Sequence, residues 1–248
     1  MKKKIGVLTY WGSQDNYGQI LQCYAFQKYL HIQGYEAFLI KYRPADKISF
    51  WKKICKKVLQ NMSLKRIRYY FSEERKKNLE IIRQERELED VAKKCSEKCE
   101  FDRFREESIV STDRIYYTVE DLITNPPDAD VYVCGSDQVW HDSYSDDNTA
   151  GWFLQFGNAK RVSYAASAGR EISNPHELAV MKKYLDTFQA VSVREESLKK
   201  VCDGIGCPAE VVLDPTLLLD YSDYSNLITN EARKPYIFIY ILNGYYVS

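Results

Sequence analysis

The sequence predicts an α/β fold, in which a parallel sheet is flanked by helices and interrupted by a charged helical insertion at about residues 47–107. Short apolar runs rich in β-branched and aromatic residues recur along the chain, as expected of buried strands. Segments with helical periodicity separate these runs, and such alternation is typical of parallel α/β sheets. Residues 51–107 contain neither Pro nor Gly and are rich in charge, which favours helices in the insertion.

The composition argues against several classes of protein. The 248 residues carry 35 Lys and Arg against 35 Asp and Glu, so the chain lacks the basic footprint of a dedicated nucleic-acid binder. Its seven cysteines stand at irregular spacings, which favours reduced thiols and a cytoplasmic protein. Cys95 and Cys99 have no second Cys or His pair at metal-ligand spacing, so we expect no metal site. No apolar run approaches the roughly 20 residues of a membrane span.

The N-terminal segment predicts a strand, a polar loop, a helix and a second strand. These elements lie at residues 5–10, 11–18, 19–33 and 37–42. The loop of such a unit lies at the ligand end of the sheet, so Asn16 and Gly18 stand where helix N–H groups could receive an anion. Gly12 and Gly18 do not form a dinucleotide-binding fingerprint, and a loop that only caps the helix remains the alternative.

The insertion begins with a basic amphipathic stretch at residues 51–68. Apolar residues recur there at helical spacing, and seven Lys or Arg flank them without an acidic residue. Such a helix either makes a peripheral contact with the cytoplasmic face of a membrane or packs its apolar stripe on the core with its lysines in solvent. From residue 73 onward charges of both signs intersperse, which is typical of solvated helical faces.

The second half of the chain continues the α/β alternation. Its predicted strands lie at residues 131–134, 161–165, 190–193, 210–213 and 236–242. A helix is expected to begin at Pro175 and to run through Phe188. Small, polar or charged residues follow most of these strands. Because ligands of open α/β sheets bind beyond the carboxyl ends of the strands, we expect the loops after them to form one wall of a ligand cleft.

Five motifs resemble those of the polysaccharide pyruvyl transferase family. They are residues 5–10 with Asp15-Asn16-Tyr17-Gly18, Gly135-Ser136-Asp137-Gln138-Val139-Trp140, Ser163-Tyr164-Ala165-Ala166-Ser167, Ser192-Val193-Arg194-Glu195 and Val212-Leu213-Asp214-Pro215-Thr216. The resemblance implies a fold like that of the two-lobed GT-B glycosyltransferases, in which this chain supplies a Rossmann-like first lobe. It also implies transfer of pyruvate from phosphoenolpyruvate to two hydroxyls of a sugar as a ketal, during capsule or exopolysaccharide biosynthesis.

The resemblance also implies partners and a domain boundary. Phosphoenolpyruvate is the donor substrate, the acceptor is a sugar or a lipid-linked oligosaccharide, and no separate cofactor takes part. Residues 1–232 correspond to the N-terminal lobe, and residues 233–248 to the first strand of a C-terminal lobe that is otherwise absent. Because that lobe contributes a His and further Arg or Ser groups to the family's anion site, we expect little or no transferase activity from this chain alone.

The implied chemistry needs an anion clamp and groups that transfer protons. Arg194 is expected to bind the carboxylate or phosphate of the donor, because a guanidinium makes two-point contacts with such anions. Pairing of Arg194 with Glu195 or Glu196 at the surface is the alternative. Asp137 is expected either to shuttle a proton or bind sugar hydroxyls, or to cap the turn that follows it.

The same loops supply the expected substrate-binding residues. These are Asn16, Gly18, Gly135, Ser136, Gln138, Trp140 and Ser167. Trp140 offers either a ring face for a sugar or a hydrophobic plug for its loop. Asp214, which precedes Pro215, is expected to be structural. Two other functions remain open: a nucleotide-sugar-dependent glycosyltransferase of similar fold, and a non-catalytic sugar-binding or scaffold module.

Overall fold

The computed structural model describes residues 2–12, 16–44, 98–141 and 148–227. The chain divides into two units, Met1–Leu218 and Leu219–Ser248. In the described part of the second unit, α10 (Tyr221–Ser225) begins with a capping box between Asp220 and Asp223. The predicted lobe boundary at residues 232 and 233, the predicted strand 236–242 and the basic stretch 51–68 lie outside the described residues.

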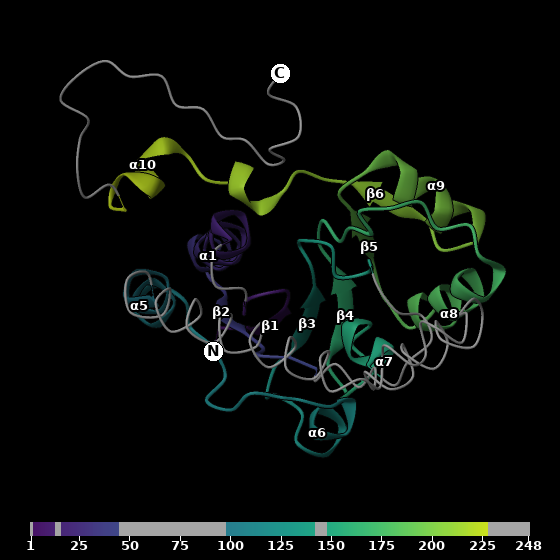
Figure 1. Ribbon diagram of the computed structural model, residues 1–248, viewed down its shortest axis with the longest axis horizontal. Coiled ribbons are helices and arrows are strands. Elements are labelled where there is room, and N and C mark those ends of the chain that lie inside the picture. Colours follow the sequence, from purple (N-terminus) through teal and green to yellow (C-terminus); the bar gives the residue numbers. More distant parts are fainter. Residues whose placement is uncertain (1, 13–15, 45–97, 142–147, 228–248) are drawn as a thin grey trace, which may run out of the picture. The chain divides into compact units, whose positions relative to one another are not determined.

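The first unit is built on parallel strands with helices on both faces (Figure 1). Four strands form one ladder in the order β2-β1-β3-β4, and two more form the ladder β5-β6. Their bounds are β1 (Lys4–Leu8), β2 (Glu36–Leu39), β3 (Val131–Cys134), β4 (Lys160–Ser163), β5 (Val191–Val193) and β6 (Ala209–Val211). This architecture confirms the predicted α/β fold with a parallel sheet flanked by helices.

Two serines join the ladders between β4 and β5. The Ser163 hydroxyl donates to the carbonyl of Ser192 at 2.9 Å and accepts from its N–H at 3.0 Å. The Ser192 hydroxyl returns a bond of 2.8 Å to the carbonyl of Ser163. Isolated bridges on either side, one of them between Ala166 and Val193, complete the junction. The strands therefore lie in the spatial order β2-β1-β3-β4-β5-β6.

Helices connect most of the strands. The described helices of the first unit are α1 (Tyr17–Ile32), α5 (Lys98–Ser108), α6 (Val119–Thr124), α7 (Thr149–Trp152), α8 (Pro175–Leu185), α9 (Glu196–Gly204) and the 3₁₀ turn η1 (Pro215–Leu217). Three predicted strands extend two residues beyond the observed ends at Leu8, Ser163 and Val211, and the strand predicted at residues 37–42 extends three beyond Leu39. In each case the next residues lie outside the regular strand. The helix predicted through Phe188 ends at Leu185. No described helix is both long and apolar enough to cross a membrane.

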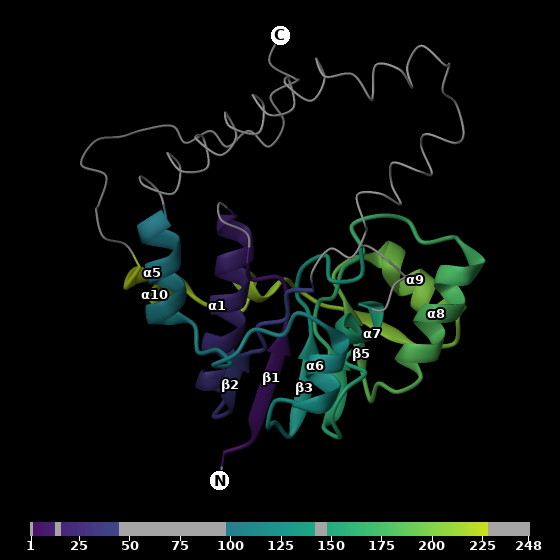
Figure 2. The ribbon, with the colours of Figure 1, turned by 60° about the horizontal axis from the view of Figure 1, so that its bottom comes forward.

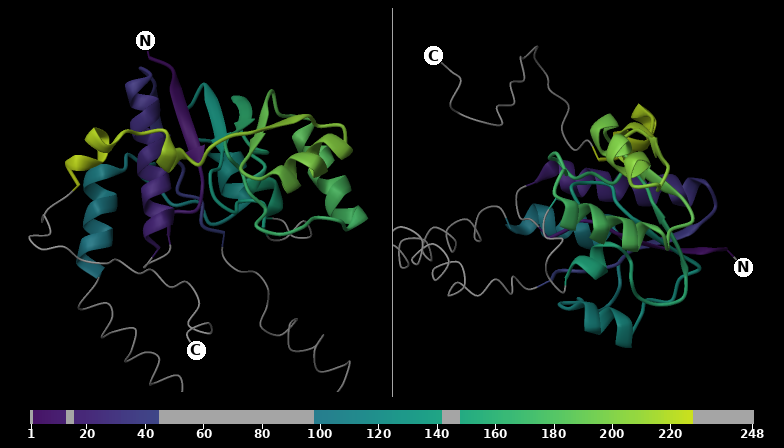
Figure 3. Two further views of the ribbon diagram at one scale, coloured as in Figure 1. Left: turned by 90° about the horizontal axis from the view of Figure 1, so that it is seen from above. Right: turned by 90° about the vertical axis from the view of Figure 1, so that its right-hand side faces the viewer.

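The two faces of the sheet bury different residues of each strand. Ile5 and Val7 of β1 pack with Phe26 and Leu30 of α1. Leu8 belongs to a larger cluster on the opposite face. That cluster also contains Tyr132 and Cys134 of β3, Leu122 of α6 and Trp152 of α7. Alternation along the strands explains this division, and Figure 3 shows α1 and α6 on opposite sides of the sheet.

Helix α1 begins two residues before and ends one residue before the predicted helix at residues 19–33. The Asn16 side chain accepts the N–H of Gln19 at 3.0 Å and caps the helix. At the other end Gly34 has a φ of 87°, which glycine adopts readily. The helix joins β1 to β2, while β3 pairs with β1 on its other side. Strand order therefore reverses direction between β1 and β3, and ligands of such sheets bind outside the carboxyl ends at that point.

Candidate functional site

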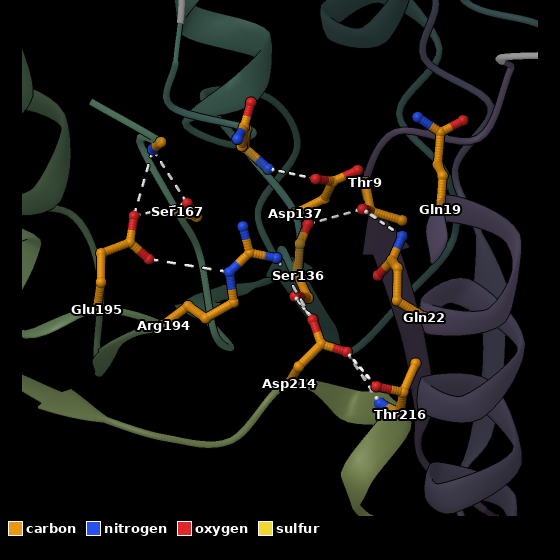
Figure 4. A network of polar contacts seen from close by, with 12 residues as sticks. Thr9, Gln19, Gln22, Ser136, Asp137, Ser167, Arg194, Glu195, Asp214 and Thr216 are labelled. Carbon is orange, nitrogen blue, oxygen red and sulfur yellow. Dashed lines mark hydrogen bonds and ion pairs between the residues drawn. The ribbon is translucent and has the colours of Figure 1, made fainter. Parts of the chain in front are cut away.

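Polar side chains from five strand ends converge at the carboxyl edge of the sheet (Figure 4). They follow β1, β3, β4, β5 and β6, and they are Thr9, Ser136, Ser167, Arg194, Glu195 and Asp214. Hydrogen bonds or ion pairs link them to one another or to residues between them. The predicted meeting of the strand-end loops is therefore present in the structure.

A buried bond crosses the point where the strand order reverses. The Thr9 hydroxyl, after β1, donates to the carbonyl of Ser136, after β3, at 2.7 Å. Nε2 of Gln22, from α1, donates to the same hydroxyl at 3.0 Å. Thr9 and Ser136 are fully buried and Gln22 is nearly so. These contacts fix the β3 loop against β1 and α1, and sequence analysis did not identify Thr9 or Gln22 as part of the site.

Asp214 connects three loops through its two carboxylate oxygens. Oδ2 accepts the Ser136 hydroxyl at 2.9 Å and lies 3.5 Å from Nη1 of Arg194. Oδ1 accepts both the N–H and the hydroxyl of Thr216, at 3.0 and 2.8 Å, and so caps η1. The expected structural role of Asp214 is present, and the residue also touches the predicted anion clamp.

Arg194 lies between two carboxylates without a short ion pair to either. Its Nε is 3.9 Å from Oε2 of Glu195, and its Nη1 is 3.5 Å from Asp214. Within the described residues, Nη2 has no hydrogen-bond partner, and Figure 4 shows that this nitrogen points away from both carboxylates. The side chain is 33% exposed. Its fork therefore remains available to an anion, although the pairing with Glu195 expected as the alternative is also present.

Glu195 is held by a second set of donors. Its Oε1 accepts the Ser167 hydroxyl at 2.6 Å and the N–H groups of Ala168 and Gly169 at 3.2 and 3.3 Å. One carboxylate thus shapes the loop after β4 and approaches the guanidinium after β5. These donors stabilise its negative charge, as those of Thr216 and Ser136 do for Asp214.

Asp137 and Gly135 give the β3 loop an uncommon backbone. Asp137 has a φ of 75°, and its Oδ1 accepts the N–H of Gln138 at 2.8 Å, which is the capping role. Its other carboxylate oxygen has no hydrogen-bond partner in the described part of the chain. Gly135 has a φ of 107°, and a Cβ there would lie 2.4 Å from the carbonyl oxygen of Tyr164. Only glycine suits that position.

Three of the predicted substrate-binding residues are buried by contacts within the protein. Trp140 is 1% exposed, and its ring stacks on Phe153 with centroids 5.1 Å apart. The ring packs in the hydrophobic core. Of the two roles expected for Trp140, the structure therefore shows the hydrophobic plug and not the ring face exposed to a sugar. Ser136 and Ser167 are 0% and 1% exposed and direct their hydroxyls to Asp214 and Glu195. Both serines therefore position carboxylates in this structure.

Three other predicted residues lie at the surface of the same edge, whereas the backbone of Gly135 is buried. Asn16, Gly18 and Gln138 are exposed, and Asn16 caps α1 as the alternative had it. The first turn of α1 contains no acidic residue, so the positive end of the helix dipole is not offset there. Among the residues that the structure describes, no group of three or more His, Cys, Asp or Glu could hold a metal ion.

Comparison with known protein families identifies the family of this chain. The family model described as polysaccharide pyruvyl transferase matches residues 16–246, which is most of the chain. The chain belongs to the polysaccharide pyruvyl transferase family. The match includes every strand-end loop described above from Asn16 onward. No curated protein and no solved structure matched the sequence.

Proposed function

We propose that this chain takes part in transferring pyruvate from phosphoenolpyruvate to two hydroxyls of a sugar, as a ketal. The observation that carries the proposal is the position of Arg194 at the carboxyl end of β5, with Nη2 unengaged by the described residues. Phosphoenolpyruvate carries a phosphate and a carboxylate, and both match a guanidinium fork. The N-terminus of the 16-residue helix α1, without acidic residues in its first turn, adds to the attraction for anions at this edge.

The reaction assigns roles to groups around Arg194. One sugar hydroxyl adds through its oxygen to carbon 2 of phosphoenolpyruvate, and carbon 3 gains a proton. The second hydroxyl then replaces phosphate at carbon 2. Two C–O bonds and one C–H bond form, while the C=C π bond, two O–H bonds and the C–O bond to phosphate break. One hydroxyl proton is balanced by the proton gained at carbon 3, and the other leaves with inorganic phosphate. Asp137, with one carboxylate oxygen unengaged by described residues, is our candidate for proton transfer. Asn16 and Gln138, exposed at the same edge, are candidates to hydrogen-bond a sugar or lipid-linked oligosaccharide acceptor.

Asp214 and Glu195 act in this proposal by holding the guanidinium. Each carboxylate accepts shorter bonds, of 2.6 to 3.3 Å, from other donors than the 3.5 and 3.9 Å contacts that it makes with Arg194. Neither carboxylate forms a close two-point ion pair with Arg194, and such a pair would compete with phosphoenolpyruvate for the guanidinium. The guanidinium is thereby oriented and still open on one side.

Calorimetric titration of phosphoenolpyruvate tests the role of Arg194. Loss of a charge-assisted contact costs about 1.5–3 kcal/mol, so Arg194→Ala should weaken binding about 10- to 100-fold. Arg194→Lys should recover only part of the affinity, because an ammonium lacks the planar fork. Arg114→Ala is the control, since Arg114 is exposed and lies outside the network.

Product analysis then tests the reaction. Incubation with phosphoenolpyruvate and an acceptor oligosaccharide should release inorganic phosphate in step with ketal formation, followed by mass spectrometry. Turnover of a nucleotide sugar with release of nucleotide, together with unchanged phosphoenolpyruvate binding in Arg194→Ala, would contradict the proposal.

A further inference from the structure

A pocket of about 390 Å³ lies between α1, α5 and the ends of β1 and β2. Its size is within the range of small-molecule sites. Figures 1 and 2 show α5 alongside α1, and ring contacts of Tyr17 with Phe101 and of Tyr24 with Phe104 hold the helices together. None of the residues assigned above to phosphoenolpyruvate or proton transfer lines this pocket.

The pocket has an apolar floor with one fixed indole beside it. Cys23, Leu39 and Ile109 form the floor and are buried. Trp11 packs against this cluster, and its indole N–H donates to the carbonyl of Tyr42 at 3.1 Å. The ring orientation is therefore set by the protein, as in sites that receive the apolar face of a ligand.

The charged groups of the pocket balance in number, and one of its two cations is already paired with an acid. Arg105 pairs with Asp102 at 2.8 Å and donates from Nε to the carbonyl of Trp11 at 3.1 Å. Lys41 donates to the carbonyl of Asp113 at 3.3 Å. With Glu106 the pocket contains two acids against two bases. A neutral ligand suits this balance better than phosphoenolpyruvate or a nucleotide, whose negative charges require an excess of cations.

Two polar side chains at the pocket remain open to a ligand. Within the part of the chain that the structure describes, the Glu106 carboxylate and the Ser111 hydroxyl have no hydrogen-bond partner. A carboxylate accepts hydrogen bonds, and a hydroxyl both donates and accepts them. Together with the apolar floor and the indole, they match a sugar ring, which presents hydroxyls at its edge and C–H groups on its face.

The position of the pocket separates it from the anion clamp. Trp11 follows β1 and Lys41 follows β2, whereas Arg194 follows β5, three and four strands away in the spatial order. At a strand spacing of about 4.8 Å, the separation is about 14–19 Å. The pocket therefore occupies a different position along the edge of the sheet from Arg194, and the two positions suit different sugar residues of one chain.

We infer that the pocket between Trp11 and α5 is a distal subsite, which binds a neutral sugar residue of the oligosaccharide acceptor while another residue of the same chain reacts near Arg194. The inference rests on the proposed function only in identifying the bound sugar as part of the acceptor of pyruvate. The carbohydrate binding itself does not require phosphoenolpyruvate, so it can be measured separately.

Direct binding of neutral glycans to the full chain tests the subsite. The probes are cello-, malto- and galacto-oligosaccharides of two to six units, and an array that carries neutral and acidic glycans, all without phosphoenolpyruvate. Wild type should bind at least one neutral oligosaccharide, and Glu106→Ala should weaken that binding about 10-fold or more, as loss of a hydrogen bond to a charged group does. Glu107→Ala is the matched control, because Glu107 is the next residue on α5, is exposed and does not line the pocket.

The outcomes separate the subsite from the proposed function. Binding of acidic glycans alone, no binding of any neutral glycan, or equal binding by wild type and Glu106→Ala would overturn the subsite. Phosphoenolpyruvate should bind equally well to wild type and Glu106→Ala. If wild type does not bind phosphoenolpyruvate but shows glycan binding that depends on Glu106, the proposed function would be wrong and the carbohydrate site would stand.

Discussion

Arg194 and Asp214 contact each other at the carboxyl ends of β5 and β6, where Nη1 lies 3.5 Å from Oδ2. The same oxygen accepts the buried Ser136 hydroxyl, and the other oxygen caps η1 through Thr216. A single carboxylate therefore joins the loop after β3, the loop after β5 and the segment after β6. Removal of the Asp214 carboxylate should therefore lower both the stability of the fold and the affinity for phosphoenolpyruvate.

The first prediction concerns the coupling between Ser136 and Asp214. Asp214→Ala removes a helix cap and leaves the Ser136 hydroxyl buried without its acceptor, so we expect a loss of about 2–4 kcal/mol in the free energy of unfolding. Ser136→Ala made in the Asp214→Ala background should cost almost nothing, because the orphaned hydroxyl is removed. Urea denaturation of the four proteins measures the cycle. Strict additivity of the two changes would show that the bond contributes nothing.

The second prediction concerns Glu195 and the loop after β4. Glu195→Ala leaves the Ser167 hydroxyl and the N–H group of Ala168 without their acceptor, and should lower the free energy of unfolding by about 1–3 kcal/mol. Glu195→Gln keeps an acceptor oxygen and should lose less. Glu196 is the exposed neighbour, and Glu196→Ala should change the free energy of unfolding by less than about 1 kcal/mol. Equal losses for Glu195→Ala and Glu196→Ala would remove the loop-shaping role.

The third prediction concerns Gly135. Gly135→Ala forces a φ of 107° on alanine and brings Cβ to 2.4 Å from the Tyr164 carbonyl oxygen. We expect a loss of about 3 kcal/mol or more in the free energy of unfolding, with weaker phosphoenolpyruvate binding because the β3 loop shifts. Gly204→Ala is the control, since a Cβ there meets nothing within 4 Å and α9 favours alanine. Thermal denaturation compares the two, and equal midpoints would contradict the steric argument.

Local sequence signals predicted the elements that position the site. The apolar run at β3 gave its bounds, Val131–Cys134. The helix predicted at residues 19–33, before Gly34, lies within two residues of the observed ends of α1. Parallel topology then required the loops after the strands to meet at one edge. This reasoning needs only hydrophobic pattern, capping chemistry and the geometry of the βαβ unit.

Contacts between distant residues could not be predicted in the same way. Asp214 bonds Ser136 across 78 positions, and Glu195 bonds Ser167 across 28. Nothing local to either carboxylate specifies its partner, so Glu195 was expected only as a surface pair for Arg194. Trp140 shows the same limit, because its burial depends on the stacked ring of Phe153 and the sequence is equally compatible with an exposed indole.

The fourth prediction concerns the pH dependence of stability above pH 9. Burial raises the pKa of the Cys23 and Cys202 thiols from an ordinary value of about 9 to about 12, and it raises that of Cys134 as well. Between those values the unfolded chain loses thiol protons that the folded chain keeps, so stability present below pH 9 falls as pH rises, by up to about 1.4 kcal/mol per pH unit for each thiol. Urea denaturation at pH 8, 9 and 10 with a phosphine reductant should show that Cys23→Ala loses about 1 kcal/mol less than wild type between pH 9 and 10. A constant offset between the two proteins at all three pH values would mean that ionisation of Cys23 does not contribute to unfolding.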